Sequence, residues 1–308
     1  MLKIVFIIII FQISYDFINL IEVSWQNNMG ISAYQIGGNV NFHNEGKYFL
    51  HFPVSELVFP VNYKSLNLGL RFCYPGKRIQ LYFNGSSTFG NQYLGKLEDS
   101  DWINSTDKKD IFSVSDTHGC LDSFIIGASV LIDQHNFFYS KLYTGIEIQY
   151  SKQYFIASNL YQYSPSDLDS TPISFKGNVL TFKRETMIPY IVLQSVHCMP
   201  SIFLLSQGQV HFFYKYSPLT KITDRDDHIL RKKLSIGESI GRSQLWGFRY
   251  RVFVYDNYQI NIEYSEEDMM TYGTQKQSRY ESTLEGNAGK IADTDLKVYA
   301  KNKKMFFF

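Results

Sequence analysis

Alternating apolar and polar residues recur along the whole chain and predict β-strands. In the segment 258–264 every second residue is Tyr or Ile, and the residues between them are Gln, Asn and Glu. This is the period of a strand with one apolar and one polar face. Similar alternation occurs in 142–150 and, more loosely, in 77–84. A soluble β-sandwich and a membrane β-barrel show the same alternation. The lengths of the connectors between the strands must therefore distinguish these two architectures.

The connectors alternate in length along the chain. We expect about ten strands, near 22–36, 55–73, 77–90, 118–133, 137–157, 174–195, 201–217, 230–254, 258–272 and 289–308. Short links fall at 74–76, 134–136, 196–200 and 255–257, and long polar ones near 37–54, 91–117, 158–173, 218–229 and 273–288. The regular alternation favours an all-β fold, a transmembrane antiparallel up-and-down β-barrel with short periplasmic turns and long extracellular loops.

The two ends of the chain agree with a secreted barrel. After Lys3, the run Ile4 to Phe11 is apolar and uncharged, as in an export signal. No clean cleavage site follows. We expect removal between Ser14 and Ser24, with an uncleaved N-terminal helix as the alternative, so 1–22 is assigned to export and 23–308 to a single barrel domain. No later stretch approaches the roughly 18 apolar residues of a spanning helix, and the chain ends in an aromatic residue.

Composition narrows the possible functions. The 308 residues are 44% apolar and 19% charged, which indicates a folded chain. The net charge of +1 gives no global field that would favour nucleic acid. The 23 Tyr and 25 Phe fit the aromatic girdles of a barrel. The three cysteines show no metal-ligand spacing, and at most one disulfide can form among them. We therefore expect no metal and no cofactor.

The candidate chemistry lies in two of the long connectors, which strand parity places at the same end of the barrel. Asp99 and Asp101 can lie on one face of an extended segment, and their mutual repulsion favours a shared proton. In the second connector, the same spacing aligns Asp224, Asp226 and His228. A carboxylate bonded to one imidazole nitrogen fixes the tautomer and makes the other nitrogen a better proton acceptor.

Each of these signals is weak alone, because an acidic connector is usually a solvated loop. Together, on facing strands at one rim, they form a site where a water could be held between a histidine and a carboxylate pair. The other histidines singled out, His118, His135 and His211, have no partner visible in the sequence and are interpreted as structural.

The sequence resembles the omptin family, ten-stranded outer-membrane aspartate/histidine proteases that cleave peptides at the bacterial surface, usually between basic residues. The segment 95–102 resembles the family's Asp-x-Asp-Trp stretch, and 187–193 resembles its Met-Pro-Tyr-Ile-x-Leu strand. Lys215-Tyr216-Ser217 then precedes the Asp-x-Asp-x-His segment at nearly the family spacing. The resemblance covers nearly the whole mature chain.

The resemblance implies a role for each candidate residue. Asp226 and His228 would be the catalytic dyad, and Asp99 and Asp101 the opposing pair that helps to hold the attacking water. Asp224 would bind the substrate's basic side chain. The implied partners are peptides or proteins at the cell surface and the lipopolysaccharide of the outer membrane, on which the family depends for activity. Approximate candidates for the lipid contact are Lys152, Lys183 and Arg184, although ordinary interfacial snorkelling is the alternative for each.

One departure from the family concerns substrate preference. Near Gly30 to Gln35, where family members often place an acidic residue in the basic side-chain pocket, this chain has Tyr34 or Gln35. Two other classes of function also fit a barrel. A non-proteolytic adhesin or invasin would not need the aligned acidic and imidazole groups, and a porin-like channel usually takes about 16 strands or more.

Overall fold

The structure, a computed structural model, describes most of the chain. Outside the described residues lie 1–19, 43–45, 50–51, 74–77, 103–107, 136–139, 168, 200–207, 256–257, 285 and 308. The predicted export segment lies mostly there, as do the predicted turn at 74–76 and parts of the other three. Residues 20–22 are described and already belong to the first strand, paired with 69–71.

Thirteen strands make up the described part of the chain. They are β1 (Leu20–Phe42), β2 (Gly46–Phe49), β3 (Ser55–Pro60), β4 (Tyr63–Cys73), β5 (Ile79–Thr88), β6 (Gln92–Asp101), β7 (Ile111–His135), β8 (Ser140–Tyr163), β9 (Ile173–Met199), β10 (Gly208–His228), β11 (Lys233–Tyr255), β12 (Tyr258–Arg279) and β13 (Gly289–Phe307). All pairings between them are antiparallel. No helix in the described residues is long and apolar enough to cross a membrane.

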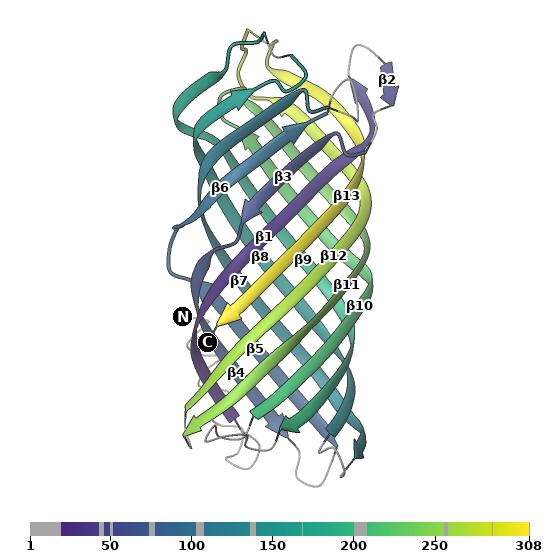
Figure 1. The fold of residues 1–308 in the computed structure, drawn as a ribbon. Coiled ribbons are helices and arrows are strands. Elements are labelled where there is room, and N and C mark those ends of the chain that lie inside the picture. The colour runs from purple at the N-terminus through teal and green to yellow at the C-terminus, as the bar shows by residue number, and fades with distance from the viewer. Residues whose placement is uncertain are drawn as a thin grey trace, which may run out of the picture.

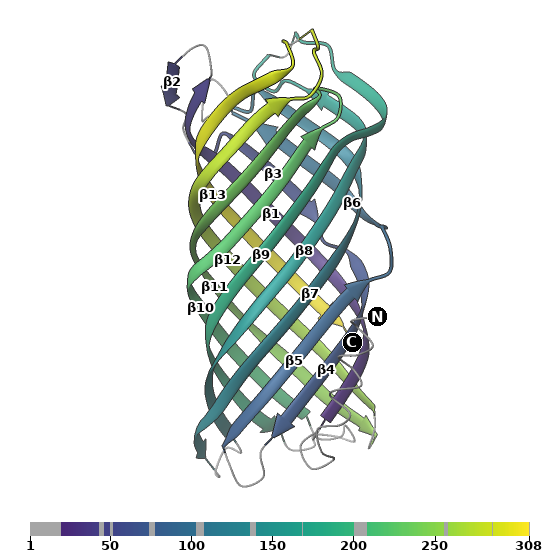
Figure 2. The ribbon, with the colours of Figure 1, turned by 180° about the vertical axis from the view of Figure 1, so that it is seen from behind.

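The strands close into a barrel. From β7 to β13 each strand pairs with the next, and β13 pairs with β1 (Figure 1). On the other side of β1, β4 and β5 complete the lower half of the wall and β3 and β6 the upper half. The lower half and the upper half of the barrel are therefore each crossed by ten of the described strands (Figure 2). This confirms the expected ten-stranded barrel.

The two ends of the barrel differ as the sequence predicts. The strand ends that flank the predicted short turns gather at one end, called the turn end here, which is the lower end in Figure 1. The longer connectors gather at the opposite end, called the loop end. The five predicted long connectors are too long, because strands continue into each of them, and two of these errors concern the candidate site. Residues 92–101 form β6, and β10 continues to His228, so both candidate segments lie on strand ends rather than in loops.

The outer face of the barrel changes character along its axis. In the half nearer the turn end, Ile126, Ile146, Ile191 and Ile260 face outward and are 53% to 67% exposed. Aromatic pairs such as Trp246 and Tyr264 lie on the same face, with ring centroids 5.6 Å apart. An outward apolar belt with aromatic residues is typical of a barrel surface in contact with lipid.

Nearer the loop end several outward positions are charged. Lys183 and Glu185 form an ion pair of 2.7 Å on β9, and Lys221 and Arg225 are exposed on the neighbouring β10. Charged side chains on the outer wall are costly in lipid, so we infer that this part of the barrel projects beyond the apolar belt. The candidate residues lie on the inner side of this projecting part.

Candidate functional site

A β-bulge in β10 turns the candidate residues into the barrel. Between the pairs Ser217–Ser243 and Thr220–Gly241, two residues of β10 oppose one of β11. Ser217 and Thr220 are both fully buried, so inward positions change from odd-numbered below the bulge to even-numbered above it. Because side chains alternate along a strand, one extra residue exchanges its two faces. Asp224, Asp226 and His228 are thereby aligned on the inner wall.

Asp226 and His228 form a hydrogen-bonded dyad. Nε2 of His228 lies 2.9 Å from Oδ2 of Asp226, and the two side chains are 24% and 16% exposed. If Nε2 holds the proton of the neutral ring, Nδ1 is left as an acceptor. Oδ1 of Asp226 is buried and makes no hydrogen bond with the described residues. In that tautomer His228 keeps one ring nitrogen as an acceptor for a ligand.

The charge of the dyad changes the acidity of its imidazole. Burial lowers the pKa of His228, but the charge of Asp226 and its hydrogen bond outweigh burial. The net effect raises the pKa above its ordinary value of 6.5. The Asp99 carboxylate adds to the rise. A more basic imidazole is a stronger proton acceptor, but it is neutral only at higher pH.

Asp99 and Asp101 lie across a small cavity from the dyad. They share the lining of a cavity of about 90 Å³ with His228 and Arg231, as the sequence analysis predicts for the two acids and the histidine. Burial, followed by the charge of Asp101, raises the pKa of Asp99 to about 7. Near neutral pH the acid pair can therefore hold one proton, which is the arrangement that a pair of neighbouring carboxylates favours.

Arg231 is a member of this cavity that the sequence analysis missed. It lies in the turn between β10 and β11 and lines the cavity together with Leu230. Its positive charge lowers the pKa of Asp99 and opposes the effect of burial. In the sequence Arg231 is one of three consecutive basic residues, a pattern that ordinarily indicates a solvated turn, so no local signal separated it from its neighbours.

Asp224 lies deeper than the dyad and is bonded to Tyr34. Only 4% of Asp224 is exposed, and its Oδ2 accepts a hydrogen bond of 2.6 Å from the Tyr34 hydroxyl. Burial raises the pKa of Asp224 to about 6, although the Tyr34 hydrogen bond acts in the opposite direction. Gln35 bonds instead to Glu56. Of the two alternatives left open by the sequence, Tyr34 is the one that meets Asp224.

The position of the Asp224 carboxylate depends on a glycine of the neighbouring strand. Gly237 pairs with Asp224 across β10 and β11. A Cβ atom at Gly237 would lie only 2.5 Å from Oδ2 and 2.9 Å from Oδ1 of Asp224. The carboxylate therefore occupies the space that the Cβ atom of any other residue at position 237 would fill.

Aromatic side chains separate the site from the rest of the barrel interior. The rings of Phe59 and Phe155 stack with centroids 4.5 Å apart, and Phe182 lies 5.0 Å from Phe59. Tyr34 contacts the ring of Phe182 at 5.4 Å. All four are at most 4% exposed. This aromatic floor, Tyr34, Phe59, Phe155 and Phe182, excludes water from the lower side of the site and strengthens the electrostatic effects within it.

Below the floor the interior is polar. Nε of Arg184 donates to Gln153 at 3.1 Å and Nη2 donates to Ser32 at 3.0 Å. Arg184 is 2% exposed and points into the barrel, so the expectation that it contacts lipid on the outer face is wrong. The one-residue step from the outward Lys183 reverses the direction of the side chain.

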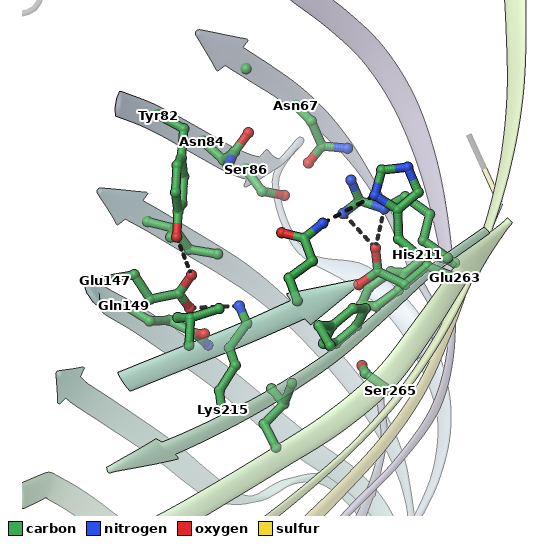
Figure 3. Close-up of a pocket in the computed structure, with 18 of the residues that line it drawn as sticks. Asn67, Tyr82, Asn84, Ser86, Glu147, Gln149, His211, Lys215, Glu263 and Ser265 are labelled. Carbon is green, nitrogen blue, oxygen red and sulfur yellow. Dashed lines mark hydrogen bonds and ion pairs between the residues drawn. The ribbon is translucent and has the colours of Figure 1, made fainter. Parts of the chain in front are cut away.

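A cavity of about 440 Å³ lies in the lumen towards the turn end. Figure 3 shows Glu147 between Tyr82 and Lys215, which donate to its carboxylate at 3.0 and 2.6 Å. Arg249 and Glu263 form a second pair at 2.5 Å. His211 lies among these side chains and bonds to Gln194 at 3.0 Å, in keeping with its structural interpretation. These paired charges line the cavity of the lower lumen.

Comparison with solved structures identifies the fold. The chain superimposes on the outer membrane protease OmpT from Escherichia coli with a TM-score of 0.67, at 15% sequence identity, over 95% of this chain and 97% of that one. The transport unit of the autotransporter AIDA-I, also from Escherichia coli, reaches a TM-score of only 0.30 at 10% identity, over 92% and 89% of the two chains. No protein-family description and no curated relative matches the sequence. The fold of the chain is thus that of an omptin barrel.

Proposed function

We propose that this protein is an outer-membrane endopeptidase that hydrolyses peptides or proteins with a directly activated water. The observation that supports this proposal is that His228, bonded to Asp226, lines one small cavity in the barrel mouth together with Asp99 and Asp101. His228 takes the proton of the water, and Asp226 orients the imidazole and stabilises its cation. The acid pair holds the water, and a protonated Asp99 donates to the developing oxyanion.

The reaction proposed here needs neither a metal nor an acyl-enzyme. General acid–base catalysis by a positioned side chain typically raises the reaction rate about 10² to 10⁴-fold. Here the proton is removed from the attacking water. The substrate's carbonyl carbon gains the hydroxyl group of that water. The departing amine receives the proton that His228 has taken, so the imidazole returns to its neutral state.

Turnover of a quenched peptide by the purified, refolded barrel tests the dyad. We expect His228→Ala and Asp226→Asn each to lower turnover by about 10² to 10⁴-fold while the barrel still assembles. His118→Ala is the matched control, because His118 packs against Tyr93 outside the cavity. The assay is run with and without lipopolysaccharide, the lipid that the resemblance implies. Full activity of His228→Ala, or abolition of wild-type activity by a chelator, contradicts the mechanism.

We further propose cleavage next to Lys or Arg, with Asp224 as the partner of the basic side chain. A buried carboxylate gains a strong charge-assisted bond from a desolvated cation. The Tyr34 hydroxyl already occupies Oδ2 of Asp224, so the incoming cation shares this carboxylate with Tyr34. We therefore expect a weaker preference for Lys or Arg than in a pocket where two carboxylates bind the basic side chain.

Asp224→Asn tests the substrate preference separately from the dyad. We expect the ratio of kcat/KM for a Lys peptide to that for its Leu counterpart to fall by about tenfold, as for the loss of one charge-assisted bond. Asp116→Asn serves as the control, since Asp116 pairs with Lys96 at 2.6 Å on the exposed wall. A wild-type protein that prefers Leu at the cut refutes the role of Asp224 and leaves the dyad untouched.

Outer-membrane insertion with the site facing outward is part of the same proposal. It is supported by the outward apolar belt and by the fold shared with an outer-membrane protein. Lys152 and Lys183 remain candidates for the lipid contact, and the Lys183–Glu185 pair lies on that outer wall. Charged side chains just beyond an apolar belt are placed where lipid headgroups lie.

A further inference from the structure

Strand β9 extends past its neighbour β10 at the loop end. Its pairing with β8 continues to Ile173, opposite Gln162. Pairing with β10 ends where Leu180 meets His228, followed by one bond of 3.0 Å from the amide of Ile229 to the carbonyl of Val179. Residues 173–178 therefore have β8 on one side and, among the described residues, no strand on the other. All six are exposed.

The unpaired segment presents apolar side chains to the barrel mouth. Phe175 lies opposite Leu160, and Ile173 lies opposite Gln162. Directly opposed residues of an antiparallel pair point to the same face of the sheet. Because Leu160 and Gln162 line the cavity of the dyad, Phe175 and Ile173 lie on that inner face. They are 40% and 57% exposed, although this part of the wall is above the apolar belt.

We propose that the free edge of β9, residues 173–178, binds the substrate polypeptide as an added β-strand, with apolar substrate side chains against Ile173 and Phe175. This inference rests on the proposed peptidase function. An exposed edge offers unpaired backbone N–H and C=O groups, and an extended peptide satisfies them whatever its sequence. A strand added here occupies the position next to β9 that β10 vacates at His228, so its end lies beside the dyad.

The same edge is poorly suited to pairing with a second copy of the chain. Lys176 lies near its middle, and lysine on an edge opposes edge-to-edge association. Gly177 has a φ of +110°, which interrupts the regular strand after Lys176. A short edge of this kind suits a transient partner such as a peptide undergoing cleavage.

Peptides of two lengths test the proposal. The short one contains only the residues next to the cut, and the long one adds an extended tail of alternating apolar residues on either side. With wild-type protein we expect the long peptide to show a KM about tenfold lower than the short one. Methylation of alternate backbone amides in the tail should remove this advantage. Equal KM values for the long peptide and its methylated form overturn the proposal.

Variants at the edge provide the second part of the test. We expect Phe175→Ser to raise KM for the long peptide several-fold, with kcat and all constants for the short peptide unchanged. Tyr161→Ser is the matched control, because Tyr161 is 47% exposed on the outer face of the same β8–β9 hairpin. An equal effect of both substitutions, or of Phe175→Ser on both peptides, contradicts an edge site.

Direct binding separates failure of this inference from failure of the peptidase proposal. The fluorescent long peptide is titrated into the full-length His228→Ala barrel, where no cleavage is expected. Binding that weakens with Phe175→Ser or with tail methylation supports the edge site even if the wild type cleaves nothing. Absence of binding overturns it. A dimer of the barrel that dissociates when Phe175 is replaced by Ser also overturns the proposal, because the edge is then a contact between two copies of the chain.

Discussion

At the scale of single residues, the acid pair and the dyad impose opposite demands on pH. The proposed mechanism requires His228 to be neutral. Burial lowers the pKa of His228, but the stronger effect of Asp226 leaves it above 6.5. The proposed donor, Asp99, must keep its proton, and burial with the nearby Asp101 raises its pKa to about 7. Activity should therefore fall as pH drops through a midpoint above 6.5 and fall again as pH rises past about 7.

The substitution Asp99→Asn separates these two demands. An amide can donate a hydrogen bond at every pH, so we expect the alkaline decline to disappear and the acid decline to remain. The measurement is the pH dependence of kcat/KM for both proteins. Full wild-type activity at pH 5, or an alkaline decline that persists in Asp99→Asn, contradicts these protonation states.

The sequence predicts which candidate residues lie together better than it predicts what surrounds them. The spacing in Asp-x-Asp-x-His aligns three side chains on any extended segment, so Asp224, Asp226 and His228 could be grouped without a structure. The contact of Tyr34 with Asp224 joins residues 190 positions apart. No local pattern encodes such a contact. The same holds for the cavity that Arg231 shares with Asp99, which is also distant in the sequence.

At the scale of elements, alternation predicts strands well where one wall faces lipid and poorly where both faces are polar. Below the bulge β10 alternates between apolar outward and mostly polar inward positions. Above it, Lys221 and Arg225 face outward while Asp224 and Asp226 face inward. With polar residues on both faces the periodicity vanishes, so this strand end resembles a loop. In β6 a bulge between Tyr93 and Gly95 breaks the alternation, and the strand end 98–101 is polar on both faces, so this strand also resembles a connector.

The bulge in β10 should be essential for activity. Deleting Leu219 removes the extra residue between Ser217 and Thr220 and should exchange the two faces of β10 above this point, so that Asp226 and His228 point out of the barrel. We expect turnover to fall by at least about 10²-fold, as for loss of the general base. A one-residue deletion at Ser282, in the connector between β12 and β13, is the control. A folded Leu219 deletion with full activity contradicts this account.

At the scale of the whole molecule, the structural charge pairs and the candidate site lie in different parts of the barrel. The lower lumen holds a cavity lined by paired charges such as Glu147 with Lys215, and the aromatic floor closes the interior above it. The site lies above this floor, on strand ends that project beyond the apolar belt. Closure into ten strands and the difference between the two ends followed from connector lengths alone. Connector lengths did not predict that β3 and β4, and likewise β5 and β6, lie at different levels of the wall. Alternation of polar and apolar residues does not identify the strand with which another strand pairs.

Cleavage of a membrane-impermeant quenched peptide by intact cells tests the central claim most directly, because it requires both the proposed activity and the proposed orientation. Cells that display the wild-type barrel should cleave the peptide next to a basic residue without permeabilisation. Cells that display equal amounts of His228→Ala should be slower by at least about 10²-fold, and His118→Ala should match the wild type. Cleavage only after permeabilisation contradicts the orientation, and equal cleavage by wild type and His228→Ala contradicts the dyad.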